Sequence, residues 1–450
     1  MAYVAPFRAY RYDPSKVALA QVVTQPYDKI TPEMQDRYYA ASPHNLVRII
    51  LGKREPGKQE TADHPDENVY TRAARFFCEW RQQGILRQDA QPSIYLYTQQ
   101  FKVPGSEVEL DRRGFIALGR VEDYAANIVF RHEQTLAKPK ADRLDLLRAT
   151  RAHFGQIFML YSDPAADIDK ALATEAVPDM RLRDEYGVLH QVWKISDPGL
   201  TEFVRTKMRD KKLIIADGHH RYETALNYRN ERRSMSAAAV ADSHQQVAEA
   251  SSTSAPSEFV MMTFVNMDSP GLVILPTHRV VHGLSSFSAD ELLKKARSYF
   301  SVDEVDASID ADRGLRLLQE AGHAGTALLG VTANRAFLFD TPKTFGSKLF
   351  GDLSLRQQSL DVVQLHKCLL ENVLGITPEA IRDQQNVSYI RDAGDALTRV
   401  RSEGANVAFL MNPVRLRQVR EIAFAGEVLP QKSTDFYPKL LSGLTVYALE

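Results

Sequence analysis

Apolar residues recur along the chain with two different periods, and these periods predict both helices and strands. Over residues 70–83 the apolar positions have helical spacing, and Gly84 follows as a helix stop. Residues 93–103 and 113–121 instead alternate between apolar and polar positions on either side of a charged turn. This second pattern predicts a β-hairpin.

Helical and strand patterns continue through the rest of the chain. Thr31 and Pro32 form a helix start, with Thr31 as the cap, and the helix is expected to run through Tyr39. Strands are expected at 47–51, 156–161, 189–195, 212–216, 259–266, 271–276, 326–331, 335–340 and 406–411, and helices at 199–210, 289–300, 312–320, 361–373, 391–402 and 414–424. The mixture predicts an α/β (α+β) fold with mixed sheets.

The length of 450 residues is enough for two to four domains, at roughly 100–200 residues per domain. Residues 1–125 are expected to form an N-terminal α/β region and residues 126–234 a phosphate-binding core. Residues 235–257 are rich in Ala, Ser and Gln, which predicts a flexible low-complexity insertion. Residues 258–450 are expected to form a C-terminal α/β region that contributes to the cleft.

Composition and charge narrow the class of protein. Hydrophobic residues make up 44% and charged residues 25%, which excludes a chain that is disordered throughout. The formal net charge of -1 provides no global attraction for nucleic acid, so nucleic acid is not expected as a partner. No apolar stretch is long enough to span a bilayer, and no signal peptide is evident, so we expect a cytoplasmic protein without a membrane partner. The two cysteines, Cys78 and Cys368, exclude a disulfide scaffold.

The strongest candidate site follows the apolar run that ends at Asp217. Gly218 permits a tight turn, and a helix is expected to begin within the next two residues, at His219, His220 and Arg221. Free backbone N–H groups and the positive end of the helix dipole would suit a phosphate there, while the Asp217 carboxylate could hold a metal ion or a substrate hydroxyl. The alternative is an aspartate N-cap followed by surface histidines.

A second polar cluster lies at residues 131–143. Glu133 is flanked by cations, and Lys138, Lys140 and Arg143 follow it. If this cluster faces the same cleft as Asp217, Glu133 could act as a base or a magnesium ligand, while the cations neutralise phosphate charge. The alternative is a solvated basic helix end. A zinc site on His132, His219 and His220 is a further alternative, although no ligand spacing supports it.

Two more segments place polar groups in unusual contexts. His278 and Arg279 follow an apolar strand, at a position where strand ends commonly present ligand groups. The segment 429–439 combines two lysines, Lys432 and Lys439, with hydroxyls and prolines, and resembles an anion-binding loop. A plain turn and a plain connector are the alternatives. The chain lacks a phosphate loop of the Walker type, a Rossmann glycine fingerprint and a Gly-x-Ser-x-Gly elbow, which disfavours the common nucleotide folds.

Several blocks together resemble a bacterial and archaeal domain-of-unknown-function family. They are PFRAYRYD at 6–13, QPYD at 25–28, RHEQT at 131–135, ADGHHRY at 216–222, LPTHR at 275–279 and PQKST at 430–434. The Asp-Gly-His-x-Arg box is also similar to the phosphate-binding box of the ParB/sulfiredoxin-like fold, which includes nucleotide-dependent kinases of free L-serine. This resemblance implies a ParB-like nucleotide-binding core with additional α/β regions.

The resemblance implies a magnesium-dependent phosphotransferase that converts free L-serine and ATP or ADP to O-phospho-L-serine. The expected catalytic residues are Asp217, Glu133 and His220, with Asp217 and Glu133 as ligands of Mg²⁺. The residues expected to bind nucleotide or phosphate are Gly218, His219, Arg221, Lys138, Lys140, Arg143, Lys432, Ser433 and Thr434, and those expected to bind the amino acid are His132, His278, Arg279 and Lys439. The rival hypotheses are a non-catalytic nucleotide-binding regulatory protein of ParB-like type and, with less support, a sulfiredoxin-like reductase. A homodimer is left open.

Overall fold

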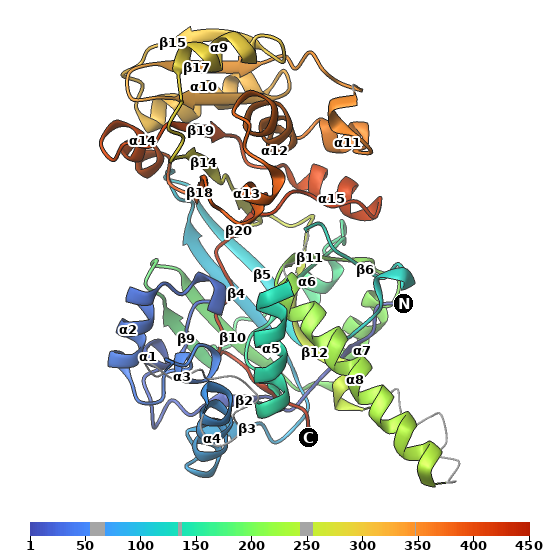
Figure 1. The fold of residues 1–450 in the computed structure, drawn as a ribbon. Helices are drawn as coiled ribbons and strands as arrows, with labels where there is room; N and C mark the ends of the chain where they lie inside the picture. Colours follow the sequence, from blue (N-terminus) through green and yellow to red (C-terminus); the bar gives the residue numbers. More distant parts are fainter. Residues whose placement is uncertain (55–67, 134–136, 244–254, 347) are drawn as a thin grey trace. The chain divides into compact units, whose positions relative to one another are not determined.

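The computed structural model describes residues 1–54, 68–133, 137–243, 255–346 and 348–450 (Figure 1). The chain divides into two compact units, and neither is continuous in sequence. Unit 1 comprises Met1–Arg131, Thr135–Val273 and Pro438–Glu450, and unit 2 comprises His132–Gln134 and Ile274–Tyr437. The predicted boundaries at 125 and 234 both lie within unit 1, and the predicted domain roles stay predictions.

Unit 1 is built on a nine-stranded mixed sheet. Its order is β6-β11-β8-β12-β5-β4-β10-β9, and β1 pairs with β5. The strands are β1 (Val4–Ala5), β4 (Ile94–Lys102), β5 (Glu109–Arg120), β6 (Val129–Phe130), β8 (Ile157–Tyr161), β9 (Met180–Arg183), β10 (Leu189–Ile195), β11 (Leu213–Asp217) and β12 (Phe259–Asn266). β4 and β5 pair antiparallel with Tyr97 opposite Gly114, which confirms the predicted hairpin. β6 and β11 run parallel, so the expectation of mixed sheets is confirmed.

The central strand β8 is apolar along its whole length because both faces of the sheet are covered. All five residues of β8 are buried, and Ile215 of β11 and Phe264 of β12 belong to the same core. Tyr222 and Ala225 of helix α8 (His219–Ser243) pack against this core, as do residues of helix α7 (Pro198–Met208). Helix α5 (Ala137–Thr150) runs beside α8 (Figure 1).

A second core in unit 1 is formed mainly by the N-terminal helices. It involves β2 (Tyr10–Tyr12), β3 (Leu86–Gln88), α3 (Val47–Ile50) and α4 (Val69–Gln82). Thr31 caps the neighbouring helix α2 (Pro32–Ala41) by accepting a hydrogen bond from the N–H of Met34, which confirms the predicted helix start. The expectation of a strand at 47–51 is wrong. This short apolar run forms α3, whose three apolar residues are all buried.

Unit 2 is built on a six-stranded sheet with the order β15-β17-β16-β19-β14-β18. The strands are β14 (His278–Val281), β15 (Ser301–Val305), β16 (Ala327–Val331), β17 (Ala336–Asp340), β18 (Val387–Ile390) and β19 (Val407–Met411). Its core joins Leu329 and Leu410 of the sheet to Leu318 of α10 (Ala311–Gly322) and Leu397 of α14 (Ala393–Arg401). The apolar stripe of each helix thus covers the sheet.

The remaining elements complete the description of the two units. They are α1 (Leu19–Val22), α6 (Asp167–Ala171), β7 (Ala152–His153), β13 (Val273–Leu275), α9 (Ala289–Ala296), α11 (Leu355–Gln358), α12 (Asp361–Gln364), the π-helix η6 (Leu365–Val373), α13 (Pro378–Arg382), α15 (Leu416–Phe424), β20 (Asp435–Tyr437) and β21 (Tyr447–Ala448). Within the predicted insertion at 235–257, α8 continues to Ser243, and residues 244–254 lie outside the described residues.

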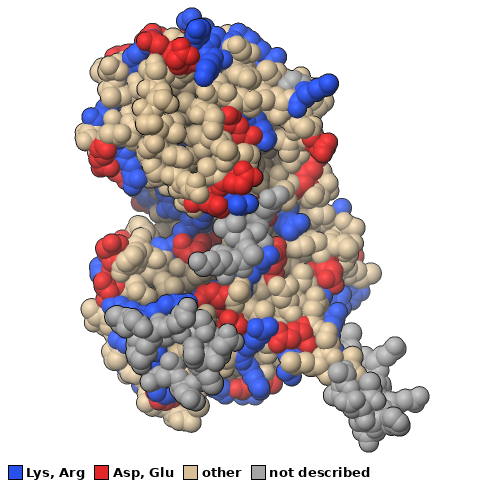
Figure 2. Space-filling view, in the orientation of Figure 1, with Lys and Arg blue, Asp and Glu red and all other residues tan. Residues whose placement is uncertain are grey.

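The distribution of charged side chains and the apolar character of the helices agree with the composition of the chain. Lys and Arg are interspersed with Asp and Glu on the face that Figure 2 shows, in keeping with the formal net charge of -1. Among the described helices, none combines the length and the apolar character that a membrane crossing requires.

Candidate functional site

The predicted site turn lies in unit 1, where β11 passes into α8. The pairing of β11 with β8 shifts register between Ile215 and Asp217, and Gly218 then adopts a φ of +93°. A side chain at Gly218 would lie 3.0 Å from the Arg221 guanidinium. Glycine therefore meets two requirements here, since it tolerates the left-handed backbone and leaves room for Arg221. Helix α8 begins at His219, as the sequence predicts.

Asp217 lies among cationic side chains. The guanidinium of Arg221 is 3.6 Å from the carboxylate and the ammonium of Lys439 is 3.7 Å away. Burial alone would raise the pKa of Asp217, but Lys439, Arg221, Lys29 and His219 outweigh burial and hold that pKa below its usual value. Asp217 is thus an ionised carboxylate whose cationic neighbours outnumber it. Such a group of cations can attract a further anion.

Lys439 reaches Asp217 from the last segment of the chain, which is held by a buried polar pair. Arg112 donates to the carbonyl of Pro438 and to the side-chain oxygen of Gln99. Gln99 in turn donates to the carbonyl of Lys439 at 2.9 Å. Arg112 is 1% exposed, and its burial lowers the pKa of its guanidinium to about 10. The hairpin β4–β5 therefore fixes the backbone position of Lys439.

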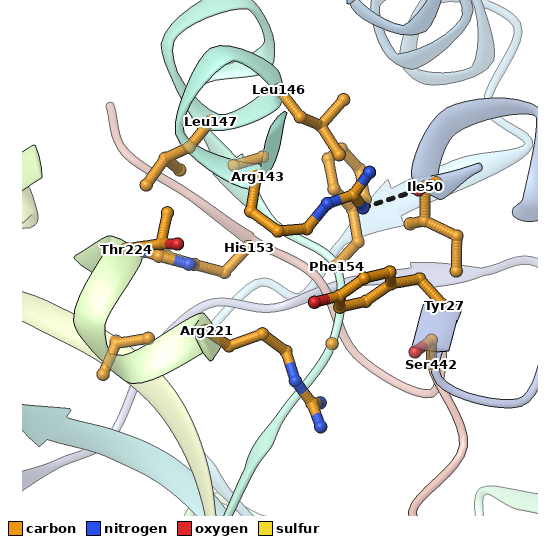
Figure 3. Close-up of a pocket in the computed structure, with 13 residues that line it drawn as sticks. Tyr27, Ile50, Arg143, Leu146, Leu147, His153, Phe154, Arg221, Thr224 and Ser442 are labelled. Atoms are coloured by element: carbon orange, nitrogen blue, oxygen red, sulfur yellow. Dashed lines mark hydrogen bonds between the residues drawn. The ribbon is translucent and has the colours of Figure 1, made fainter. Parts of the chain in front are cut away.

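Arg221 also lines a small cavity of about 70 Å³ beneath the start of α8 (Figure 3). The walls are mainly apolar and include Leu146, Leu147 and Phe154. Thr224 contributes a hydroxyl that is buried and has no hydrogen-bond partner among the described residues. One water molecule needs roughly 10–15 Å³, so the cavity has room for a few water molecules or for a ligand group of similar size.

The other cations predicted for this part of the site have definite partners in unit 1. Arg143 donates to the carbonyl of Ile50 at 2.6 Å and stacks over the ring of Tyr27 at 4.3 Å (Figure 3). Lys140 forms an ion pair with Glu223 at 2.8 Å. The structure gives both cations local partners, and their phosphate-binding roles stay predictions. The side chain of Lys138 lies outside the described residues.

A different set of predicted residues comes together in unit 2. Nε2 of His132 lies 2.8 Å from the hydroxyl of Thr434, and the Glu133 carboxylate accepts a hydrogen bond from the N–H of Lys432. Lys432 has a φ of +56°, an uncommon conformation for a residue with a side chain. The hydroxyl of Ser433 donates to the carbonyl of Pro430. These contacts bring His132 and Glu133 next to residues 432–434, which lie roughly 300 residues later in the chain.

His278 and Arg279 are also in unit 2, but they are buried at the beginning of β14. Nδ1 of His278 accepts a hydrogen bond from the N–H of Met411, and burial lowers the pKa of His278 to about 4. Arg279 donates to the carbonyls of Thr277 and Lys432. The contacts of Arg279 support the loop at 430–434, while the predicted roles of both residues in substrate binding stay predictions.

Asp217 and Glu133 are the residues predicted to hold Mg²⁺. The described part of the chain contains no group of three or more His, Cys, Asp or Glu that could hold a metal ion. Asp217 belongs to unit 1 and faces cations, whereas Glu133 belongs to unit 2 and accepts a backbone hydrogen bond. The predicted roles of Asp217 and Glu133 as Mg²⁺ ligands therefore stay predictions. Mg²⁺ can instead enter with the phosphates of a nucleotide, as it commonly does.

The sequence over residues 4–363 matches the family described as "Protein of unknown function (DUF1015)". The chain belongs to this family. The match covers most of the chain and confirms the resemblance drawn from the sequence blocks. No curated protein matches the chain.

Three solved structures illustrate the similarity of this DUF1015 protein to known folds. A variant of a free serine kinase in complex with ADP is 12% identical, with 76% of this chain and 96% of that chain covered and a TM-score of 0.37. A conserved hypothetical protein from Pyrococcus furiosus is 11% identical, with 69% and 87% covered and a TM-score of 0.33. SbnI with a C-terminal truncation, from Staphylococcus aureus, is 10% identical, with 74% and 87% covered and a TM-score of 0.33. All three TM-scores are below 0.5, so the chemistry of this DUF1015 protein must be argued from its own residues.

Two contributors to the site of this DUF1015 protein, Lys29 and Arg112, were not predicted from the sequence. Lys29 acts on Asp217 from the short helix η1 (Tyr27–Lys29), directly after the QPYD block, which was the available signal. Lys439 is predicted to bind substrate, and the structure places it 3.7 Å from the Asp217 carboxylate, so that role stays a prediction. Arg112 gives no signal in the sequence because it lies in an alternating strand pattern.

Proposed function

We propose that this protein is a nucleotide-dependent phosphotransferase that moves a phosphoryl group from ATP or ADP to the hydroxyl of free L-serine, giving O-phospho-L-serine. The observation that carries the proposal is the ionised Asp217 among Lys439, Arg221 and Lys29 at the start of α8. Cations and a helix start favour a polyphosphate, and a carboxylate among them can orient a hydroxyl. L-Serine is the first acceptor to test because of the resemblance at residues 216–222.

In the proposed reaction, a new bond forms between the serine oxygen and the transferred phosphorus while the bond from that phosphorus to the bridging oxygen of the donor breaks. Arg221 and Lys439 would hold phosphate oxygens, and Asp217 would orient the serine hydroxyl. Phosphoryl transfer depends mainly on positioning and charge neutralisation, which these residues can supply. Mg²⁺ would enter bound to the nucleotide. Glu133 belongs to unit 2, and its role as the acceptor of the hydroxyl proton stays a prediction from the sequence.

The rival function is a regulatory protein that binds nucleotide without transferring a phosphoryl group. One observation favours it, because the contacts of Asp217 with both Arg221 and Lys439 could serve only to hold those two cations in place. The same cations would then bind the nucleotide phosphates, and no acceptor would be needed.

A binding measurement combined with a turnover measurement separates the two functions. The purified full chain is titrated with ATP and with ADP by calorimetry, and is then incubated with each nucleotide, Mg²⁺ and a panel of free amino acids and small alcohols. Nucleotide binding together with O-phosphoserine formation supports the phosphotransferase. Tight binding without a phosphorylated product from any acceptor supports the regulator. If neither ATP nor ADP binds, the phosphotransferase and the regulatory function are both contradicted.

A further inference from the structure

Unit 2 contains a cavity of about 140 Å³ where strand β19 passes into helix α15. Its walls come from the end of α10, from the start of α12 and from the loop that joins β19 to α15, all of which belong to unit 2. One water molecule needs roughly 10–15 Å³ of such space, so the cavity has room for a molecule of about ten non-hydrogen atoms. A nucleotide is too large for it.

Asp361 provides the negative charge of this cavity. It lines the cavity from the start of α12 and is half-buried, so part of the residue is open to a ligand. Burial raises the pKa of this carboxyl to about 7, although Ala327, Thr326 and the charge of Arg415 act in the opposite direction. The effect of Arg415 is the smallest of the four, so the two side chains line one cavity without neutralising each other. A carboxyl in this setting gains from a cationic group that a ligand brings.

Arg415 provides the positive charge. It lies directly before α15, is exposed and lines the same cavity. Its Nη2 atom donates a hydrogen bond to the carbonyl of Gly322 at 2.7 Å, at the end of α10. A guanidinium has five N–H donors in a planar fork, so this contact orients the side chain and leaves donors for a carboxylate.

Two carboxamides add uncharged hydrogen-bonding groups to the lining. Nδ2 of Asn412 donates to the carbonyl of Leu318 at 2.8 Å, and Oε1 of Gln418 accepts from the N–H of Arg415 at 2.9 Å. The side-chain oxygen of Asn412 can accept a further hydrogen bond, and the side-chain nitrogen of Gln418 can donate one. The two amides thus suit the same pair of ligand groups as the two charges, a donor such as an ammonium and an acceptor such as a carboxylate.

The rest of the lining limits the size of the ligand. It consists mostly of apolar residues and two glycines, namely Leu360, Val362, Met411, Pro413, Val414, Gly322 and Gly325. A side chain at Gly322 would overlap Nδ2 of Asn412, so glycine is needed for this arrangement of the wall. Apolar walls in a cavity of this volume suit a short aliphatic group.

We propose that this cavity binds a small zwitterionic amino acid, with the ammonium group of the ligand on Asp361 and its carboxylate on Arg415. The opposite charges select the zwitterion, because a plain amine or a plain carboxylate would leave one of the two groups without a partner. The volume selects amino acids of the size of glycine, alanine or serine. The site does not depend on the proposed phosphotransferase activity, since it is formed by unit 2 and the Asp217 turn belongs to unit 1.

L-Alanine is the probe, because it has no hydroxyl and cannot accept a phosphoryl group there. L-Alaninol keeps the ammonium but replaces the carboxylate, and L-lactate keeps the carboxylate but replaces the ammonium with a hydroxyl. Binding of each compound to the full chain is measured by calorimetry or by ligand-observed NMR. We expect L-alanine to bind at least tenfold more tightly than either analogue. Absence of L-alanine binding, or an analogue that binds as tightly, would overturn the proposal.

Arg415→Gln tests the location of the carboxylate. Arg417→Gln is the matched control on α15, because the side chain of Arg417 is 81% exposed and pairs with Glu421 at 3.5 Å. We expect Arg415→Gln to weaken the binding of L-alanine at least tenfold, as for the loss of a charge-assisted hydrogen bond, and Arg417→Gln to leave it unchanged. Unchanged affinity in folded Arg415→Gln would place the bound probe elsewhere and overturn the proposal.

Asp361→Asn tests the contact with the ammonium and does not depend on the Arg415 variant. The pKa of Asp361 is raised in the folded state, so its ionised form costs stability above the unfolded pKa, and we expect the melting temperature of the variant at pH 8 to equal or exceed that of wild type. We also expect the affinity for L-alanine to fall at least tenfold. Wild-type affinity in this variant would overturn the contact assigned to Asp361.

Proton release gives a readout that a purely structural Asp361 would not change. An ammonium beside Asp361 favours its ionised form, so wild type should release a fraction of a proton when L-alanine binds at pH 7. Calorimetry in two buffers with different ionisation enthalpies detects this release as a difference between the two heats of binding. Equal heats in both buffers would contradict the placement of the ammonium on Asp361.

Discussion

At the residue scale, the charge state of Asp217 decides what the turn can do. Burial opposes ionisation, yet the surrounding cations hold the pKa of this carboxyl below its usual value. An ionised carboxylate can orient a hydroxyl, whereas a protonated one would donate its own hydrogen bond. The residue types around Asp217 were partly predictable, since Asp217 and Arg221 lie close together in the sequence. Lys29 was not predicted, and Lys439 was predicted to bind substrate but was not paired with Asp217, because distant segments bring both residues to the turn.

Asp217 should also make stability depend on pH in one direction. Its folded-state pKa is lowered relative to the unfolded chain, so the carboxylate stabilises the fold above the unfolded pKa, and that stabilisation is lost as the pH falls towards the folded pKa. We expect the free energy of unfolding of wild type to exceed that of Asp217→Asn near neutral pH and the difference to shrink below about pH 4. Urea unfolding of both proteins at several pH values measures this difference in the free energy of unfolding. A difference that grows as the pH falls would contradict this assignment.

His153 should contribute a second pH dependence at higher pH. Its ring stacks on Tyr447, and burial lowers its pKa to about 4 from the usual 6.5. Because the folded state prefers the neutral ring, stability is full above the unfolded pKa of 6.5 and is lost as the pH falls towards 4. We expect His153→Phe to lose less stability than wild type between these pH values. His278 has a similarly lowered pKa and remains in the variant, so the pH dependence should be reduced and not abolished.

At the element scale, the turn between β11 and α8 was predictable because local rules govern it. An apolar run that ends in Asp-Gly and leads into a helical pattern predicts the strand, the turn and the helix. The short run at 47–51 could not be assigned by the same rules, since its apolar residues fit a buried helix and a buried strand equally well. The LPTHR block follows the end of strand β13, as expected, and His278 and Arg279 then begin β14, which pairs with two neighbouring strands.

Gly218→Ala tests the role of the turn. The substitution places a side chain at a φ of +93° and within 3.0 Å of the Arg221 guanidinium, so we expect a loss of about 1 kcal/mol or more in stability and a weaker affinity for ADP. Gly105→Ala is the matched control. Gly105 has a φ of +73° and nothing within 4 Å of the added side chain. The control should lose stability and keep its affinity for ADP, as measured by calorimetry. Equal ADP affinity in both variants would show that the turn does not position Arg221 for phosphate.

At the scale of the whole molecule, the chain returns to unit 1 after completing unit 2. The segment Pro438–Glu450 carries Lys439 to Asp217 and pairs β21 with β7. Similarly, residues His132–Gln134 belong to unit 2. The assignment of these short segments to the other unit could not be predicted from hydrophobic periodicity. Pairing between residues hundreds of positions apart depends on the folded sheets and leaves no local sequence pattern. The mixed α/β class, most strands of the unit 1 sheet and three of the six strands of the unit 2 sheet (β16, β17 and β19), in contrast, followed from local patterns.

Lys439→Gln and a chain that ends at Tyr437 separate two contributions of this last segment. The point variant removes the cation but keeps the pairing of β21 with β7, so we expect a stable fold whose affinity for ADP is about 10–100-fold weaker, as for the loss of a charge-assisted hydrogen bond. The shortened chain should lose affinity and also melt at a lower temperature. Calorimetric titration and thermal unfolding measure the two effects. Wild-type affinity in Lys439→Gln would exclude Lys439 from the phosphate site.

The most direct test of the proposed function compares wild type with Asp217→Asn in a phosphoryl-transfer experiment. Each protein is mixed with L-serine, Mg²⁺ and either ATP or ADP, and O-phosphoserine is followed by ³¹P NMR, while nucleotide affinity is measured on the same samples. We predict that wild type forms O-phosphoserine with at least one donor, and that folded Asp217→Asn binds the nucleotide at least as tightly but forms no product. The proposed function would be contradicted if wild type formed no O-phosphoserine with either nucleotide, or if Asp217→Asn formed it at the wild-type rate.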